Sequence, residues 1–122
     1  MKLRFRKNSL RLRLNRREVD GLAAGISLEE CIYFPGNALI RYVLEASAQS
    51  SPRASFEDST IRISAPQQMV RDWVENDVIG IYFELPANST ELRIAIEKDL
   101  ECVEGPAEER DPDAFPRPSK NC

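Results

Sequence analysis

The sequence predicts an α+β fold in which a mostly antiparallel eight-stranded sheet, or partly closed barrel, carries two short helices. Three observations support this prediction. Segments that alternate apolar and polar residues dominate the chain, and only two segments have helical spacing. These signals also come in the same order twice, in residues 2–46 and again in residues 54–99. We therefore interpret the chain as two ββαββ pseudo-repeats. Two short helices can cover only part of the apolar face, so the sheet must curl into a barrel or a two-layer sandwich to bury the rest.

The first expected hairpin lies in residues 2–14, with its turn at Lys7-Asn8. Leucine and phenylalanine alternate with arginine on both sides of this turn, and a period of two is typical of strands with one apolar face. The opposite face would carry arginines, whose forked guanidinium groups suit phosphate and carboxylate. These candidate anion-binding residues are Arg4, Arg6, Arg11 and Arg13.

The first helix should begin after Asn15 and end near Gly25. The Asn15 side chain can accept hydrogen bonds from first-turn amides, and Glu18 can reach back to complete a capping box. Glycine after the last turn is typical of a helix end. Two strands, near residues 27–34 and 38–46, should follow, because the Pro-Gly-Asn sequence between them favours a turn.

The second half is expected to repeat this order after a polar seam at residues 47–53. Ser64 and Gln67 have the spacing of a second capping box, and Pro66 fits the first turn of the helix. The apolar face of this helix contains Trp73, which we expect in the core. The remaining strands are predicted near residues 54–57, 60–64, 78–85 and 90–98.

Residues 1–102 are therefore expected to form a single α+β domain, and residues 103–122 a proline-rich acidic tail. Four of the eight prolines lie in residues 104–122, and a segment with so few apolar residues cannot form a core of its own. Phe115 and Pro116 give this tail one apolar anchor. We expect it to dock either onto the sheet of the domain or onto a partner.

Composition excludes several kinds of chemistry. The 122 residues contain no histidine, which removes Ser-His-Asp and Cys-His catalysis and histidine-based metal sites. The three cysteines are an odd number, and free thiols are the default in a reducing compartment. A disulfide or metal site at Cys102 and Cys122 stays open as an alternative, although no Cys-x-x-Cys pair is present. We expect no cofactor and no metal.

The protein is expected to be cytoplasmic. No apolar run reaches the roughly 20 residues that span a bilayer, and the basic start lacks the uninterrupted apolar segment of a signal peptide. We therefore expect no membrane partner. The formal net charge is −3, but eight of the 17 Lys and Arg lie in residues 1–17. The two ends of the chain can therefore attract each other or serve different partners.

Four segments carry a pattern beyond simple alternation. They are residues 9–14 followed by Glu18-Val19, residues 54–61, an Glu-Lys-Asp-x-x-Cys pattern at residues 97–102, and an Asp-Ala-Phe-Pro-x-Pro pattern at residues 113–118. Together they resemble a family of small, uncharacterised bacterial proteins known as a domain of unknown function. The resemblance covers nearly the whole chain, and its closing segment is the most specific part. It implies a bacterial protein whose tail belongs to the domain, and it implies no activity.

The sequence favours a non-catalytic protein-binding or self-associating module, and exposed strand edges would favour a homodimer if the barrel does not close. The alternative is an anion or nucleic-acid binder that uses the arginine-rich hairpin. A competing interpretation of this hairpin is a solvated face paired with glutamates across strands, since 20 acidic residues can neutralise 17 basic ones. The enzyme class comes last. A closed barrel would resemble triphosphate-tunnel hydrolases, but their acidic opening strand has no counterpart in residues 2–7.

Overall fold

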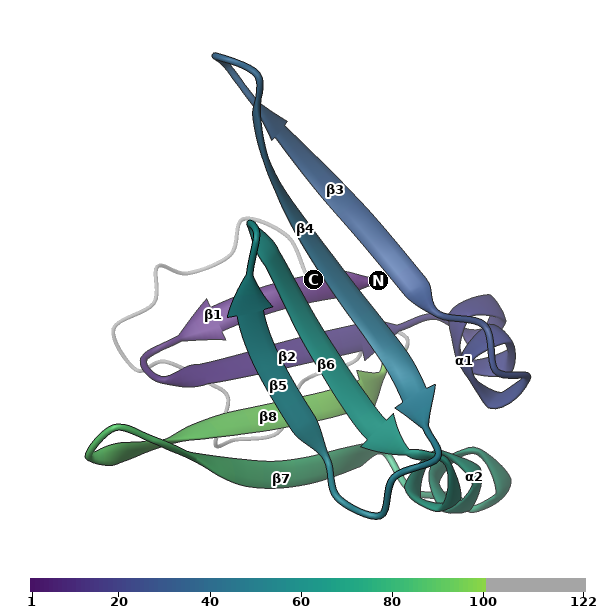
Figure 1. The fold of residues 1–122 in the computed structure, drawn as a ribbon. Helices are drawn as coiled ribbons and strands as arrows, with labels where there is room; N and C mark the ends of the chain where they lie inside the picture. The colour runs from purple at the N-terminus through teal and green to yellow at the C-terminus, as the bar shows by residue number, and fades with distance from the viewer. Residues whose placement is uncertain (101–122) are drawn as a thin grey trace, which may run out of the picture.

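The computed structural model describes residues 1–100, which form eight strands and two helices (Figure 1). The first half contains β1 (Lys2–Arg6), β2 (Ser9–Leu14), α1 (Arg16–Ala23), β3 (Leu28–Phe34) and β4 (Ala38–Ser47). The second half contains β5 (Arg53–Glu57), β6 (Thr60–Pro66), α2 (Gln67–Glu75), β7 (Gly80–Ala87) and β8 (Thr90–Lys98). The predicted α+β class is confirmed, and each predicted strand and helix is present close to its expected bounds.

The strands form two four-stranded sheets, each drawn from both halves of the chain. Sheet A has the order β1-β2-β8-β7, and sheet B has the order β3-β4-β6-β5. The outer pairs of each sheet are antiparallel hairpins, whereas the central pairs, β2 with β8 and β4 with β6, are parallel. The prediction of a mostly antiparallel eight-stranded sheet or partly closed barrel is therefore confirmed only in part. Four of the six strand pairings in the described chain are antiparallel, but the eight strands form two mixed sheets instead of one. Hairpins from the two halves join side by side in parallel, and neither sheet closes on itself.

The two halves occupy corresponding places in the two sheets. Ser9, the first residue of β2, lies opposite Arg93 of β8, and Thr60, the first residue of β6, lies opposite Arg41 of β4. Each strand of one half has a counterpart in the other: β1 corresponds to β5, β2 to β6, β3 to β7 and β4 to β8. Replacing every strand by its counterpart therefore converts the strand order of sheet A into that of sheet B. Each sheet thus carries one hairpin from each half at the same relative position.

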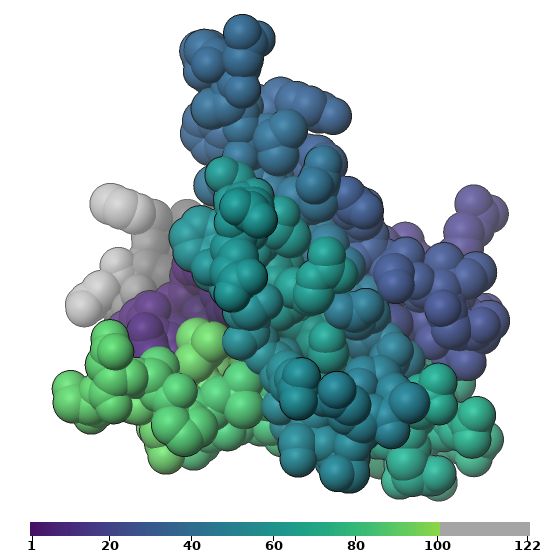
Figure 2. Space-filling view, in the orientation of Figure 1, coloured from purple at the N-terminus to yellow at the C-terminus, as the bar shows by residue number. Residues whose placement is uncertain are grey.

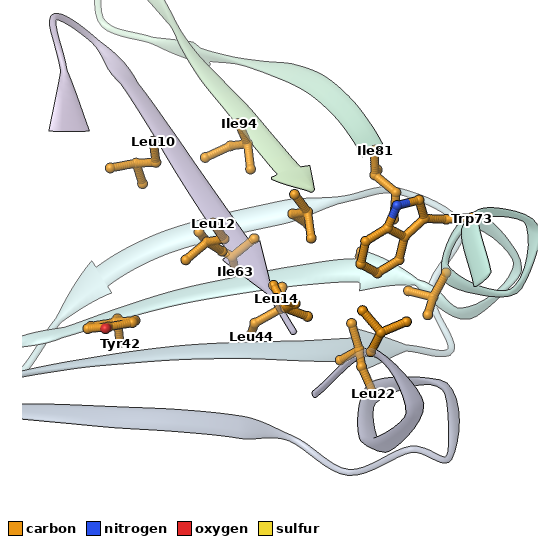
Figure 3. Packing of buried hydrophobic residues seen from close by; sticks show 14 residues of the cluster. Leu10, Leu12, Leu14, Leu22, Tyr42, Leu44, Ile63, Trp73, Ile81 and Ile94 are labelled. Carbon is orange, nitrogen blue, oxygen red and sulfur yellow. The ribbon is translucent and has the colours of Figure 1, made fainter. Parts of the chain in front are cut away.

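The core lies where the apolar faces of the two sheets meet the helices. Figure 1 shows α1 and α2 next to each other at one end of the molecule. Trp73 of α2 is 2% exposed, as predicted, and its indole Nε1 donates a hydrogen bond to the Ile79 carbonyl oxygen at 2.9 Å. The other buried residues of this cluster (Figure 3) are Leu10, Leu12, Leu14, Val19, Leu22, Tyr42, Leu44, Ile63, Ala65, Val70, Ile81, Ile94 and Ile96.

The first predicted capping box is confirmed, whereas the second is wrong. The Glu18 amide donates to Asn15 Oδ1 and the Asn15 amide donates to Glu18 Oε1, both at 2.9 Å. At the second site, β6 continues through Pro66, so Ser64 stays in the strand and its hydroxyl donates to Glu45 Oε1 at 3.1 Å. Helix α2 then begins at the next residue without a side-chain cap. The parallel pairing of β6 with β4 thus overrides the local capping signal.

Within residues 1–100, no helix has the length and apolar character needed to cross a membrane. The predicted tail with its anchor residues Phe115 and Pro116 lies outside the described residues, as do Cys102 and Cys122. The expected domain boundary at residue 102 stays a prediction.

Candidate functional site

The outer face of sheet A carries the four predicted arginines, but the structure divides them into two groups. Arg4 of β1 lies opposite Arg11 of β2, and Arg13 follows on the same face of β2. Arg6 lies further along β1, opposite Ser9 and next to the turn between the two strands. The four side chains therefore share one face of the sheet without forming one site.

Two members of the first group, Arg11 and Arg13, lie beside the carboxylate of Glu97 of β8, which is 8% exposed. Its Oε1 lies 3.2 Å from Arg11 Nε and 3.8 Å from Arg13 Nε, and the Tyr82 hydroxyl donates to its Oε2 at 2.6 Å. Gly80 leaves the room for this contact, because a Cβ there would lie 2.8 Å from the Tyr82 hydroxyl. Arg11 and Arg13 are thus engaged inside the protein, which agrees with the interpretation of a face paired across strands.

The second group lies at a hollow between the tips of the β1–β2 and β7–β8 hairpins. Asn8 joins the two tips, since its carbonyl oxygen accepts from the Arg93 amide at 3.1 Å and its Nδ2 donates to the Glu91 carbonyl at 2.7 Å. The hollow has a volume of about 880 Å³. Arg6, Lys7 and Arg93 line it, together with a single carboxylate among the described residues. The described lining of the hollow is therefore mainly positive, with one carboxylate where metal-assisted hydrolysis uses two.

Glu91 and Glu84 form a carboxyl pair beside this hollow. The hydrogen bond between their side chains, and after it their charge repulsion, raises the pKa of Glu91 above its usual value. Arg93, whose Nε lies 3.7 Å from Glu84 Oε1, acts in the opposite direction. Glu91 therefore holds its proton at a higher pH than an isolated glutamate does.

A different surface, which the sequence analysis did not single out, is the free end of the β3–β4 hairpin. β4 begins at Ala38 but pairs with β6 only from Arg41 onward, whereas its pairing with β3 runs to the hairpin turn. Residues 32–40 therefore form a two-stranded ribbon that no third strand of sheet B borders. We call residues 32–40 the overhang. Figures 1 and 2 show it in blue, projecting past the rest of the described chain.

The overhang is apolar on both faces and contains no charged residue. Tyr33 is 77% exposed, Phe34 49% and Ile32 47%. Because side chains alternate along a strand, Ile32 and Phe34 lie on the face that continues into the core, and Tyr33 lies on the opposite face. Monomeric proteins rarely expose apolar side chains in such a group unless the group is an interaction site.

The apolar surface continues from the overhang along the inner face of sheet B. Ile40 lies opposite Ile32, and the next inward-facing residue of β4 is the buried Tyr42. Ile61 and then Phe56 occupy the same row of the sheet as Tyr42, and Phe56 is 68% exposed. The overhang is thus the free end of an apolar face whose other end is the core.

The charged residues nearest to the overhang lie at its base, where it joins the rest of sheet B. On the inner face, the Tyr42 hydroxyl donates to Glu30 Oε2 at 3.4 Å, and burial, followed by the negative charge of Glu30, raises the pKa of Tyr42. On the outer face, Arg41 Nε lies 2.5 Å from Glu29 Oε1. A hydrogen bond with Cys31, followed by the charge of Glu29, raises the pKa of Arg41. These contacts hold the base in place and leave the tip to apolar residues.

The corresponding hairpin of sheet A has a tip of different character. Phe34 ends β3 where Ala87 ends β7, and Leu39 is the second residue of β4 where Glu91 is the second residue of β8. The same place in the architecture is therefore aromatic and uncharged in one half and small or charged in the other. One sequence signal indicates this surface, namely ten consecutive uncharged residues at positions 31–40 in a chain that is 30% charged.

The chain matches the family described as Family of unknown function (DUF7009) over residues 1–119. The protein belongs to this family, which confirms the resemblance to a domain of unknown function. No curated protein and no solved structure matches the chain. The family description names no activity, so the function is argued from the two surfaces described above.

Proposed function

We propose that the protein is a non-catalytic protein-binding or self-associating module and that the overhang is its binding surface. The observation that carries this proposal is the exposure of Tyr33, Phe34 and Ile32 on a projecting ribbon without charge. Burying apolar surface contributes roughly 25 cal/mol per Å², so three such side chains supply several kcal/mol to association. Tyrosine is also enriched among the residues that dominate binding energy at interfaces.

The geometry of the hollows supports the non-catalytic part of the proposal. The hollow at the hairpin tips gathers basic side chains around one described carboxylate, Glu91. The two sheets do not close into a barrel, so residues 1–100 do not enclose the lumen that a triphosphate-tunnel hydrolase would need. A flat charged face and a projecting apolar ribbon are the features of a module that binds a macromolecule.

Three further statements belong to the same proposal. The equal registers of Ser9 with Arg93 and of Thr60 with Arg41 support an internal duplication of one ββαββ unit. A bacterial origin is what the family resemblance implies, and a cytoplasmic location is the expectation from the sequence. None of these three statements is needed for the overhang to bind a partner.

The proposal is tested by affinity capture from the source organism with tagged full-length protein. The double variant Tyr33→Lys/Phe34→Lys places two charges on the overhang and should lose the partner that the wild-type protein retains. Val78→Lys is the matched control, because Val78 is 47% exposed and lies after α2, away from the overhang. Proteins are identified by mass spectrometry and the binding is then measured with the purified partner.

A partner that binds the wild-type protein and the overhang variant equally well would contradict this assignment of the surface. Loss of the partner in both variants would point to general damage, so the melting temperatures of all three proteins are measured alongside. The proposal requires loss in the overhang variant alone, with melting temperatures that agree.

A second candidate function is the binding of a phosphate-bearing anion at the hollow between the hairpin tips. The observation that favours it is the convergence of Arg6, Lys7 and Arg93 on that hollow. Binding of a single-stranded oligonucleotide should then weaken steeply between about 50 and 200 mM salt. The Arg6→Ala/Arg93→Ala variant should remove it. Binding that does not depend on salt concentration, or that persists in this variant, would contradict the hollow as the anion-binding site.

A further inference from the structure

We infer that the overhang binds a second copy of this chain, through antiparallel pairing of two β3 strands about a two-fold axis. This inference rests on the proposed function and adds the identity of the partner. Three observations carry it: the free edge of β3, the absence of charge in residues 32–40, and the placement of Glu29 and Glu30 along the strand.

The first observation is the edge itself. β3 is an end strand of sheet B, and β4 is its neighbour on one side. Its other side faces no strand of the described chain, so the backbone N–H and C=O groups there are available to another strand. Proteins usually protect such edges with charges, prolines or bulges. Residues 32–34 carry none of these within the strand.

The second observation is the chemistry of self-pairing. A two-fold interface brings the same surface from both copies together, so a surface with one sign of charge would repel itself. Residues 32–34 avoid this repulsion and offer aromatic side chains to both faces of the joined sheet, whereas the two carboxylates of β3, Glu29 and Glu30, make the register decisive. Aromatic pairs across neighbouring strands stabilise a sheet.

The third observation is the register. Cys31 is the middle residue of β3, so full-length antiparallel pairing places the axis at this residue. Glu30 then lies opposite the partner's Ile32, and Glu29 lies opposite the partner's Tyr33. No carboxylate meets another carboxylate directly across the strands. Pairing of the two edges would join both copies of sheet B into one eight-stranded sheet.

The expected interface is modest in size. Tyr33, Phe34 and Ile32 are between about half and three quarters exposed, and a fully exposed aromatic residue offers roughly 150–250 Å². At these exposures the three side chains offer about 260–430 Å², so even with the strand edge the interface falls short of the roughly 800 Å² per partner of a standard interface. We therefore expect a reversible dimer with a dissociation constant on the order of micromolar to tens of micromolar.

Sedimentation equilibrium of the full-length protein over that concentration range tests the inference. The wild-type protein should shift from monomer to dimer. Tyr33→Glu/Phe34→Glu adds a carboxylate opposite the partner's Glu29 and should weaken the dimer by about tenfold or more. Val78→Glu should dimerise like the wild type. The single variant Tyr33→Glu, at a site that is 77% exposed, repeats the test if the double variant folds poorly.

Cross-linking tests the edge pairing independently. In the variant Cys102→Ser/Cys122→Ser, Cys31 is the remaining thiol of the three. Residues directly opposite each other in an antiparallel pair have Cβ atoms about 5 Å apart, so a short bismaleimide should link two copies through Cys31. A dimer that does not cross-link at Cys31, or that persists in the overhang variants, overturns the inference.

The remaining outcomes separate this inference from the proposed function. The wild-type protein could stay monomeric and still retain a captured partner that the overhang variant loses. This result would overturn the inferred dimer and leave the proposed function standing. A protein that dimerises only after truncation at Leu100 assigns the overhang to the chain's own C-terminal segment and also overturns the inference. A monomer without any overhang-dependent partner contradicts both.

Discussion

At the scale of single residues, Glu97 determines how much positive charge sheet A offers to a ligand. Its carboxylate is almost fully buried between Arg11, Arg13 and the hydroxyl of Tyr82. Truncating it would leave two arginines without this partner, and truncating the arginines would leave a buried charge. Glu97 therefore ties the predicted anion-binding face to the stability of the fold.

The alternation of arginine and leucine predicts which face the arginines share, because alternation is a local property of a strand. The sequence could not predict that Glu97 packs between Arg11 and Arg13. That contact requires β2 to lie in parallel beside β8, and these strands come from opposite ends of the described chain. The pairing depends on how the two halves join, which local spacing does not encode.

Glu91 gives a prediction about pH. Its pKa is raised by the hydrogen bond to Glu84 and by the charge of that residue. A pKa raised on folding stabilises the protein below the unfolded pKa, about 4.3 for glutamate, and this contribution is lost as pH rises through the folded pKa. Glu91→Gln removes the repulsion at neutral pH and keeps a hydrogen-bond donor for Glu84.

The variant should therefore melt at a higher temperature than the wild-type protein at pH 7, and the difference should shrink as the pH falls toward about 4. Melting temperatures followed by circular dichroism across this range provide the measurement. Glu75→Gln, at an exposed position of α2, serves as the control for loss of one negative charge. A melting-temperature difference that does not change with pH would show that the repulsion between Glu91 and Glu84 does not affect stability.

At the scale of elements, β4 has two parts with different roles. From Arg41 to Ser47 it pairs with β6, as far as Leu44 it also pairs with β3, and it buries Leu44 completely. From Ala38 to Ile40 it pairs with β3 alone and supports the overhang. One continuous strand thus supplies both the core and the proposed binding surface.

The hairpins, the turn at Pro35-Gly36-Asn37 and the first helix cap could be predicted from the sequence, because each depends on neighbouring residues. Gly36 and Asn37 do adopt positive φ, at 81° and 58°, as that turn chemistry requires. The overhang could not be predicted, because it depends on where β6 stops covering β4. The second cap failed for the same reason, since Ser64 is held by pairing with β4 instead.

The two parts of β4 and its hairpin should respond differently to substitution. Leu44→Ala removes a fully buried side chain and should cost about 2–5 kcal/mol of unfolding free energy. Tyr33→Lys, at a site that is 77% exposed, should change it by less than about 0.5 kcal/mol. Urea denaturation of both variants measures these values. A large loss of stability in Tyr33→Lys would mean that the overhang packs within the molecule.

At the scale of the whole molecule, the mixing of the two halves explains why an apolar ribbon is left uncovered. The apolar faces of sheets A and B meet at the end that carries the helices, where the buried residues cluster. The strands of the two sheets run in different directions, and the β3–β4 hairpin extends beyond sheet A (Figure 1). In a closed barrel a neighbouring strand would border β3, whereas in two separate sheets its edge stays open.

The most direct test of the overhang as the binding surface is residue-by-residue NMR of the backbone amides, recorded at several protein concentrations and with any captured partner. The account predicts that shifts and line broadening concentrate in residues 28–41, and that Tyr33→Glu/Phe34→Glu abolishes them. Changes confined to the outer face of sheet A around Arg6 and Arg93, with residues 28–41 unaffected, would contradict it and favour the anion-binding hollow.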